Sequence, residues 1–213
     1  MPGVYVVAEH DRGEISPATH EAFTAAAGLA LSLNEDAVAV FVGTFESDFE
    51  ATCARYGIAK GVVLDSPVIS DYGPEIWGQA VAALVDHCDP RIVMGVGTDK
   101  GNEILAQASA RTASAFVANC VQVEYREGWS ITRTQWGGSL LEDVTVHDDR
   151  LFLSYAHHAI EPVLSSTETG VEVQVIEVEL DPSLTRTLVK DRTTQAEGAT
   201  LSTASVVVSG GRG

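Results

Sequence analysis

A glycine-rich segment near the middle of the chain has the residue types of an anion-binding loop. Gly95, Gly97, Thr98 and Gly101 follow the apolar run Arg91–Met94 and open a segment with helical character. Glycines let backbone N–H groups approach an anion, and the N-terminus of a helix attracts negative charge. The chemistry that this segment could perform is the binding of a phosphate or a nucleotide.

Two features of the same segment favour an explanation without a ligand. The glycine spacing is GxGxxxG, which is neither a dinucleotide fingerprint nor a Walker sequence. Asp99 and Glu103 would compete with a phosphate for the same N–H groups. Thr98 or Asp99 as the helix N-cap, with Glu103 serving the first turn, accounts for the pattern. Nucleotide binding at Gly95–Gly101 is therefore kept as the less favoured alternative.

The histidines are the other residues that could carry chemistry. His10 lies beside acidic residues in a loop after the first apolar run, and His157-His158 follow a later strand and precede Glu161. Neither position has helical i, i+4 spacing or implies a third ligand, so we expect no metal site. Acid–base catalysis by Glu9, His10 or Glu161 is a minor hypothesis, since isolated carboxylates are usually solvated. With neither a GxSxG motif nor a local cysteine–histidine signature, we expect no catalytic residue.

Alternating elements must position these residues in the first half of the chain. We expect strands at 4–8, 37–42, 61–64 and 91–94, and helices at 18–33, 48–56, 72–87 and 99–111. Continuous apolar strands separated by helices indicate a parallel sheet that is covered on both faces. The fold class is therefore α/β.

After about residue 115 the pattern becomes rich in strands. Segments 116–125, 130–135, 140–146 and 151–155 are strand-like with short connections, and 171–180 alternates apolar and polar residues. We expect an antiparallel β-rich extension of the sheet, or one packed beside it.

The end of the sequence predicts a change of domain. We expect one domain over residues 1–180, a polar linker over 181–203, and a new strand with a glycine-rich turn over 204–213. Such a strand and turn normally open a βα unit. We therefore expect the chain to be truncated at the start of a second domain.

Composition limits the classes of partner. The 213 residues include 30 Asp and Glu against 13 Lys and Arg, a net charge of −17, which disfavours nucleic acid and anionic membrane surfaces. There is neither a stretch of about 20 apolar residues nor a secretory signal, and the three separated cysteines suit a reducing compartment, so we expect a cytoplasmic protein. The acidic, lysine-poor composition also raises the hypothesis of a halophilic source.

Several segments together resemble one known family over essentially the whole chain. They are Val6–Gly13, Pro17–Glu21, Asp89–Gly101, Thr132–Arg133 with Gly137–Gly138, and above all Val206–Gly213 (VVVSGGRG). They resemble the alpha subunit of electron transfer flavoproteins, the FixB family. Departures from the family pattern occur at Ala106 and Gln107, where Pro-Arg is common, and at Asn119, where Asp is common.

The resemblance implies a fold and a role. The fold would be a three-layer Rossmann-like sheet of the adenine-nucleotide-hydrolase-like type, and the role an electron carrier subunit rather than an enzyme. Such a subunit forms a heterodimer with a beta subunit, which binds AMP, and passes electrons from flavin dehydrogenases to a quinone reductase or another acceptor. FAD would be held mostly by the domain after Gly213, with Arg212 contributing a contact. The alternative is a stand-alone adenine-nucleotide-binding module that uses Gly97–Glu103 and no flavin.

Overall fold

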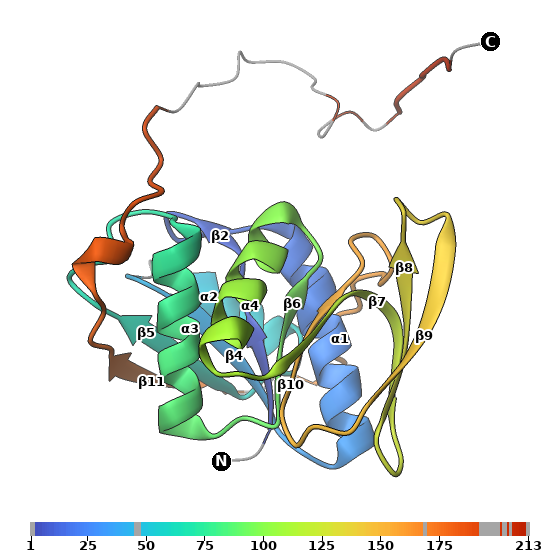
Figure 1. The fold of residues 1–213 in the computed structure, drawn as a ribbon, viewed down its shortest axis with the longest axis horizontal. Coiled ribbons are helices and arrows are strands. Elements are labelled where there is room, and N and C mark those ends of the chain that lie inside the picture. The colour runs from blue at the N-terminus through green and yellow to red at the C-terminus, as the bar shows by residue number, and fades with distance from the viewer. Residues whose placement is uncertain are drawn as a thin grey trace.

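The computed structural model describes residues 3–44, 48–167, 170–191, 201, 204 and 206–211. Most of the described strands join one nine-stranded sheet in the order β11-β5-β4-β1-β6-β10-β7-β8-β9 (Figure 1). The strands are β1 (Val4–Val7), β4 (Ala37–Val42), β5 (Lys60–Asp65), β6 (Ile92–Val96), β7 (Ala115–Tyr125), β8 (Trp129–Gln135), β9 (Leu140–Val146), β10 (Leu151–Tyr155) and β11 (Glu172–Glu177). A small separate hairpin pairs β2 (His10–Asp11) with β3 (Glu14–Ile15).

Helices cover both faces of the sheet, as the apolar strands predict. The helices are α1 (Pro17–Leu33), α2 (Asp48–Arg55), α3 (Pro74–Cys88), α4 (Asp99–Arg111) and the short 3-10 helix η1 (Pro182–Leu184). Side chains alternate along each strand, so Val4 and Val6 pack in a core with α1 and α2, whereas Tyr5 and Val7 pack in a core with α3 and α4. The α/β fold class is confirmed. None of the helices within the described residues is long and apolar enough to cross a membrane.

The second half of the chain corrects one expectation. β7, β8 and β9 pair antiparallel, as predicted, but β10 runs parallel to both β6 and β7, and β11 runs parallel to β5. Short connections predicted hairpins because parallel neighbours normally need a crossover of a dozen residues or more. Here a bulge near Cys120, beside Asn119 at φ 59°, interrupts the register of β7. Bulges bend strands, and residues at both ends of β7 border one pocket. The end of β9 and the residue before β10 border the same pocket, so the short connection over 147–150 suffices to lead from β9 into β10.

Residues after β11 continue to pack against the core beside α3. The Val178 N–H donates to the Asp65 carbonyl at 2.9 Å, and Val178 and Leu180 are buried in the core beside α3. Leu184 of η1 packs partly against the same core. The sequence predicts a strand at 204–208, but the described residues of that range are not in one, and Val206 and Val208 are exposed. Arg212 lies outside the described residues.

Candidate functional site

The carboxyl edge of the sheet has a topological switch point between β1 and β6. From β1 the strand order runs through β4 and β5 to one side, and through β6 and β10 to the other, so β1 and β6 flank a topological switch point. Ligands of open α/β sheets bind in the crevice at such a point. The predicted segment Gly95–Gly101 spans the end of β6 and the first residues of α4, and its Thr98 contacts Glu9, which follows β1. The structure therefore places the sequence-predicted loop where a ligand would be expected.

The glycines of this loop are explained by close packing. A Cβ at Gly101 would overlap the carbonyl oxygen of Val96, and a Cβ at Gly97 would overlap the side chain of Asn119 and approach the Tyr155 carbonyl within 2.8 Å. The Gly97 N–H donates to that same carbonyl at 2.6 Å. Gly97 is needed to bring the segment against β7 and β10, and Gly101 is needed to bring the first turn of α4 against the end of β6, whether or not an anion binds.

A carboxylate of the protein itself occupies the start of α4. Thr98 is the N-cap: its Oγ1 accepts from the Gly101 N–H at 3.0 Å and donates to Glu9 Oε2 at 2.5 Å. Glu9 is fixed in turn, since its N–H donates to Thr19 Oγ1 at 2.9 Å and its carbonyl accepts from the Thr19 hydroxyl at 2.7 Å. The positive end of the helix dipole is thus offset by Glu9, and a phosphate placed there would meet a like charge.

A polar network behind the loop was not foreseen. Ser154 is fully buried in β10; its hydroxyl donates to Asn102 Oδ1 at 2.6 Å and accepts from the Asn119 N–H at 2.9 Å. Asn102 Nδ2 donates to Asn119 Oδ1 at 3.3 Å. Asn tolerates the left-handed backbone that position 119 adopts, as the Asp common in the family also would.

The other departures lie in a helix contact. Gln107 packs on Gly78 of α3 so closely that a Cβ on the glycine would overlap it. Arg111 donates to the Gln107 carbonyl at 2.8 Å and to Gln79 Oε1 at 3.1 Å. This part of α4 therefore packs against α3 and does not face the Gly95–Gly101 segment.

His10 is a buried structural group rather than a loop residue open to solvent. It is 5% exposed and stacks on Phe41 at 3.8 Å between ring centroids. Its Nε2–H donates to the Val42 carbonyl at 3.0 Å, and its Nδ1 accepts from the Gly13 N–H at 3.1 Å. Burial lowers the pKa of His10 from 6.5 to about 4. With both ring nitrogens engaged and the ring neutral, His10 is not available as a general base.

A small pocket of about 260 Å³ lies beside His10. Its wall includes Trp77 and Tyr72, and an ion pair between Arg12 and Asp71 at 3.2 Å crosses its rim. The Tyr72 hydroxyl donates to Glu103 at 2.7 Å, so Glu103 faces α3 rather than capping its own helix. Because its aromatic side chains are packed and its charged side chains are paired, we regard this pocket as a secondary feature of the carboxyl edge.

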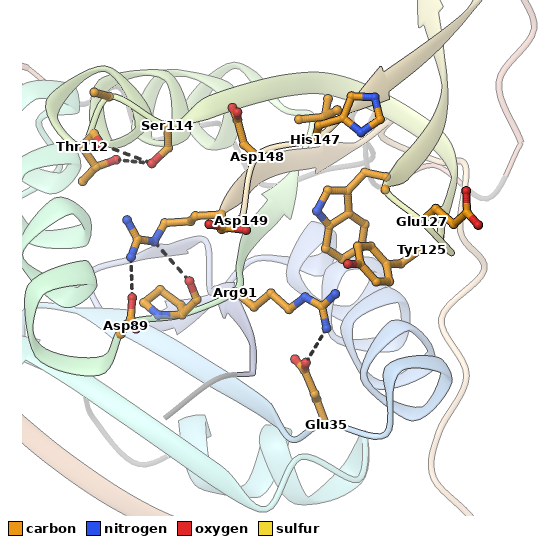
Figure 2. A pocket seen from close by; sticks show the side chains of 16 residues that line it. Glu35, Asp89, Arg91, Thr112, Ser114, Tyr125, Glu127, His147, Asp148 and Asp149 are labelled. Carbon is orange, nitrogen blue, oxygen red and sulfur yellow. Dashed lines mark hydrogen bonds and ion pairs between the residues drawn. The ribbon is translucent and has the colours of Figure 1, made fainter.

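A larger pocket of about 790 Å³ lies at the amino-terminal edge of the sheet (Figure 2). Arg91 pairs with Glu35 at 2.9 Å and lies over the Tyr125 ring at 4.0 Å from the centroid. Arg150 pairs with Asp89 at 2.5 Å. Further acidic side chains line it: Glu127, Asp148 and Asp149. These contacts tie the end of β7 to the start of β6, and the acidic lining disfavours an anionic ligand.

The histidine pair after β10 has a partner that the sequence did not reveal. Glu21, on α1, lies beside both His157 and His158. Glu161, the carboxylate nearest to them in sequence, is exposed. Glu21 is more than 130 residues away in the chain, so no local spacing could have identified it.

The fold and its switch point define a class of protein. A doubly wound sheet with such a switch point is a Rossmann-like α/β domain, and here a carboxylate of the same chain lies beside the N-terminus of α4. Residues 4–182 match the family described as Electron transfer flavoprotein domain. The chain therefore belongs to the electron transfer flavoprotein family.

Curated relatives align along almost the whole chain. Protein FixB of Bradyrhizobium diazoefficiens is 28% identical, covering 99% of this chain and 59% of the relative. The electron transfer flavoprotein subunit alpha of Bacillus subtilis is 24% identical, covering 99% and 64%. The lactate dehydrogenase (NAD(+),ferredoxin) subunit LctC of Acetobacterium woodii is 22% identical, covering 99% and 51%. The chain thus spans about half to two thirds of the length of these relatives.

Proposed function

We propose that this chain is the scaffold part of an electron transfer flavoprotein alpha subunit. The family match and the relatives named as alpha subunits and FixB support this assignment. The observation that carries the scaffold role is the Glu9–Thr98 hydrogen bond, which places a carboxylate of the chain itself beside the N-terminus of α4. The alternative of a stand-alone nucleotide-binding module is not favoured by the same contact.

The proposed role is electron carriage by a complex rather than catalysis by this chain. In that complex FAD is bound with a contribution from Arg212, AMP is bound by the beta subunit, and flavin dehydrogenases supply electrons to a quinone reductase or another acceptor. The cysteines are free, and Cys53 and Cys120 are buried, which suits a reducing compartment such as the cytoplasm.

The absence of FAD from the isolated chain is testable by absorption spectroscopy. The purified chain is expected to be colourless, because a carboxylate lies beside the N-terminus of α4 and a single arginine cannot hold a flavin. A more stringent form of the test is to incubate the chain with excess FAD and to remove unbound flavin by gel filtration. Stoichiometric flavin absorption that co-elutes with the chain would show that the flavin site has been misplaced.

The β8–β9 hairpin is the surface that we assign to the beta subunit. Trp136 in its turn is 82% exposed, and Leu140 and Leu141 at the start of β9 are 55% and 69% exposed. Successive residues of a strand point to opposite faces, so exposure of both leucines means that neither face of the hairpin end is covered. β9 is also an edge strand, at one end of the sheet. Large exposed apolar side chains on a projecting edge are typical of an interaction site.

A binding experiment tests this surface. Replacing Trp136 and Leu141 together by serine is expected to weaken calorimetric binding of the beta subunit by roughly tenfold or more, because large apolar side chains dominate such interfaces. Leu31→Ser is the control, since Leu31 is 82% exposed on α1. Equal affinity of the double variant and the wild type would exclude the hairpin, and a loss in Leu31→Ser alone would place the interface on α1.

A further inference from the structure

One cluster among the described residues has the donor atoms and spacing of a transition-metal site. Glu21 Oε1 lies 3.3 Å from His158 Nδ1 and 3.6 Å from His157 Nε2. The three donor atoms all lie within 4.8 Å of one another. The glutamate comes from α1, and both histidines come from the segment that follows β10.

The cluster is held in place by contacts that do not depend on an ion. The second glutamate oxygen, Oε2, accepts the backbone N–H of His158 at 2.7 Å, which fixes the carboxylate. His158 has φ 66°, and its ring stacks on that of His157 at 3.7 Å between centroids. The same segment is tied to α1 again by the Val163 N–H, which donates to Thr24 Oγ1 at 3.0 Å. The donors are therefore preorganised.

The distances fit tetrahedral coordination. Zinc bonds to imidazole nitrogen and carboxylate oxygen are about 2.1 Å long, which places neighbouring ligand atoms of a tetrahedron about 3.4 Å apart. The two distances from Glu21 Oε1 bracket that value. A hydrogen bond to the other oxygen of a ligating carboxylate is the usual support for such a ligand.

Burial and charge favour a cation at this position. The Glu21 side chain is 10% exposed, whereas those of His157 and His158 are 39% and 79% exposed, so the anionic ligand is buried and the fourth position faces solvent. The chain carries a net charge of −17, which attracts cations. Two imidazoles with one carboxylate suit zinc better than magnesium or calcium, which prefer oxygen ligands.

We propose that Glu21, His157 and His158 bind a Zn²⁺ ion, with a water molecule in the fourth position, and that the ion joins α1 to the segment after β10. The competing account is an ion-free cluster in which both imidazole N–H groups donate to Glu21 Oε1. Sequence spacing predicted no metal here because the third ligand is distant in the chain.

Calorimetric titration of the chelator-treated full chain with ZnCl₂ distinguishes the two accounts. The wild type is expected to bind one equivalent with a dissociation constant at or below about 1 μM. Glu21→Gln keeps an oxygen to accept the His158 N–H, and His158→Asn keeps a residue that tolerates positive φ. Each is expected to weaken binding by roughly 100-fold or more, because even an outer partner of a metal ligand is worth 10- to 100-fold.

The matched control is His87→Asn, at an exposed histidine of α3. It is expected to bind Zn²⁺ as the wild type does. No zinc binding by the wild type, unchanged binding in both cluster variants, or loss of binding in His87→Asn would each overturn the proposal.

A second measurement needs no variant. Nitrogen NMR of the imidazoles in the wild-type chain should show that Zn²⁺ shifts the signals of His157 and His158 and leaves those of the other four histidines in place. Shifts confined to other histidines, or no shifts, would contradict the site even if a variant failed to fold.

Discussion

At the scale of single residues, two polar groups determine how the carboxyl edge behaves. Glu9 places its carboxylate at the start of α4, and His10 uses both ring nitrogens to hold Val42 and Gly13. Neither role was predictable from the sequence, where both residues lie in a polar loop. The partner of Glu9 is Thr98, the N-cap of α4, and the partners of His10 are Val42 in β4 and Gly13 in the β2–β3 turn. Contacts between separate segments leave no local pattern in the sequence.

The buried His10 predicts a loss of stability in mild acid. Its pKa is lowered by burial first and also by Lys100, against opposing effects of the Val42 carbonyl and Asp11. The unfolded chain therefore takes up a proton below pH 6.5 that the folded chain does not take up until about pH 4. The His10 contribution is complete above pH 6.5 and falls by about 3 kcal/mol on the way to pH 4.

Urea unfolding between pH 7 and pH 4 measures this effect. His10→Gln is expected to be less stable at pH 7 but to lose less stability on acidification than the wild type. The control is His87→Gln, at an exposed histidine. An identical slope in His10→Gln and the wild type would contradict the assignment of His10 as a neutral buried ring.

At the scale of elements, the first half of the fold could be predicted and the second half only in part. Apolar runs and caps located β1, β4, β5, β6 and the helices, since both signals are local. α3 begins at Pro74 rather than at 72 because Gly73 is its extended N-cap and Pro occupies the first turn. The direction of β10 could not be predicted, because it depends on the bulge that bends β7 and not on any pattern within β10.

Two helical glycines, Gly101 in the first turn of α4 and Gly28 in α1, give a matched test of close packing. Gly101→Ala is expected to destabilise the fold by about 2 kcal/mol or more, because the new methyl group overlaps the Val96 carbonyl. Gly28→Ala, in α1 with open space around it, should instead stabilise by about 0.5 kcal/mol or more. Denaturant midpoints compare the pair, and a neutral Gly101→Ala would contradict the packing explanation of this glycine.

At the scale of the whole molecule, the net charge and the carboxylate beside α4 both disfavour anionic ligands. With a net charge of −17 on a small domain, the acidic side chains repel one another, and the same charge disfavours phosphate-rich partners. Within the described residues the partly exposed pair of Lys60 and Asp36 contributes little against that repulsion. The proposed scaffold role therefore rests on the exposed apolar hairpin β8–β9 as the surface for a partner.

The charge predicts that salt stabilises the fold. The melting temperature is expected to rise from low to molar KCl, with most of the gain below about 1 M, where the screening length has fallen to about 3 Å. Thermal unfolding followed by circular dichroism is sufficient to measure it. A flat or falling melting temperature would show that self-repulsion has little influence on the stability of the fold, and it would also reject the hypothesis of a halophilic source.

The most direct test of the scaffold account is calorimetric titration of the wild-type chain with AMP and with ADP. No measurable binding is expected, because the Glu9 carboxylate lies beside the N-terminus of α4 and would repel a phosphate, and the Thr98 hydroxyl is already bonded to Glu9. Glu9→Gln keeps an acceptor for Thr98 but removes the charge. Weak affinity for a nucleotide in this variant would show that the Glu9 charge excludes the ligand, and no affinity would show that the side chain excludes it by its volume. Micromolar binding of AMP or ADP by the wild-type chain would contradict the account and favour the nucleotide-binding module.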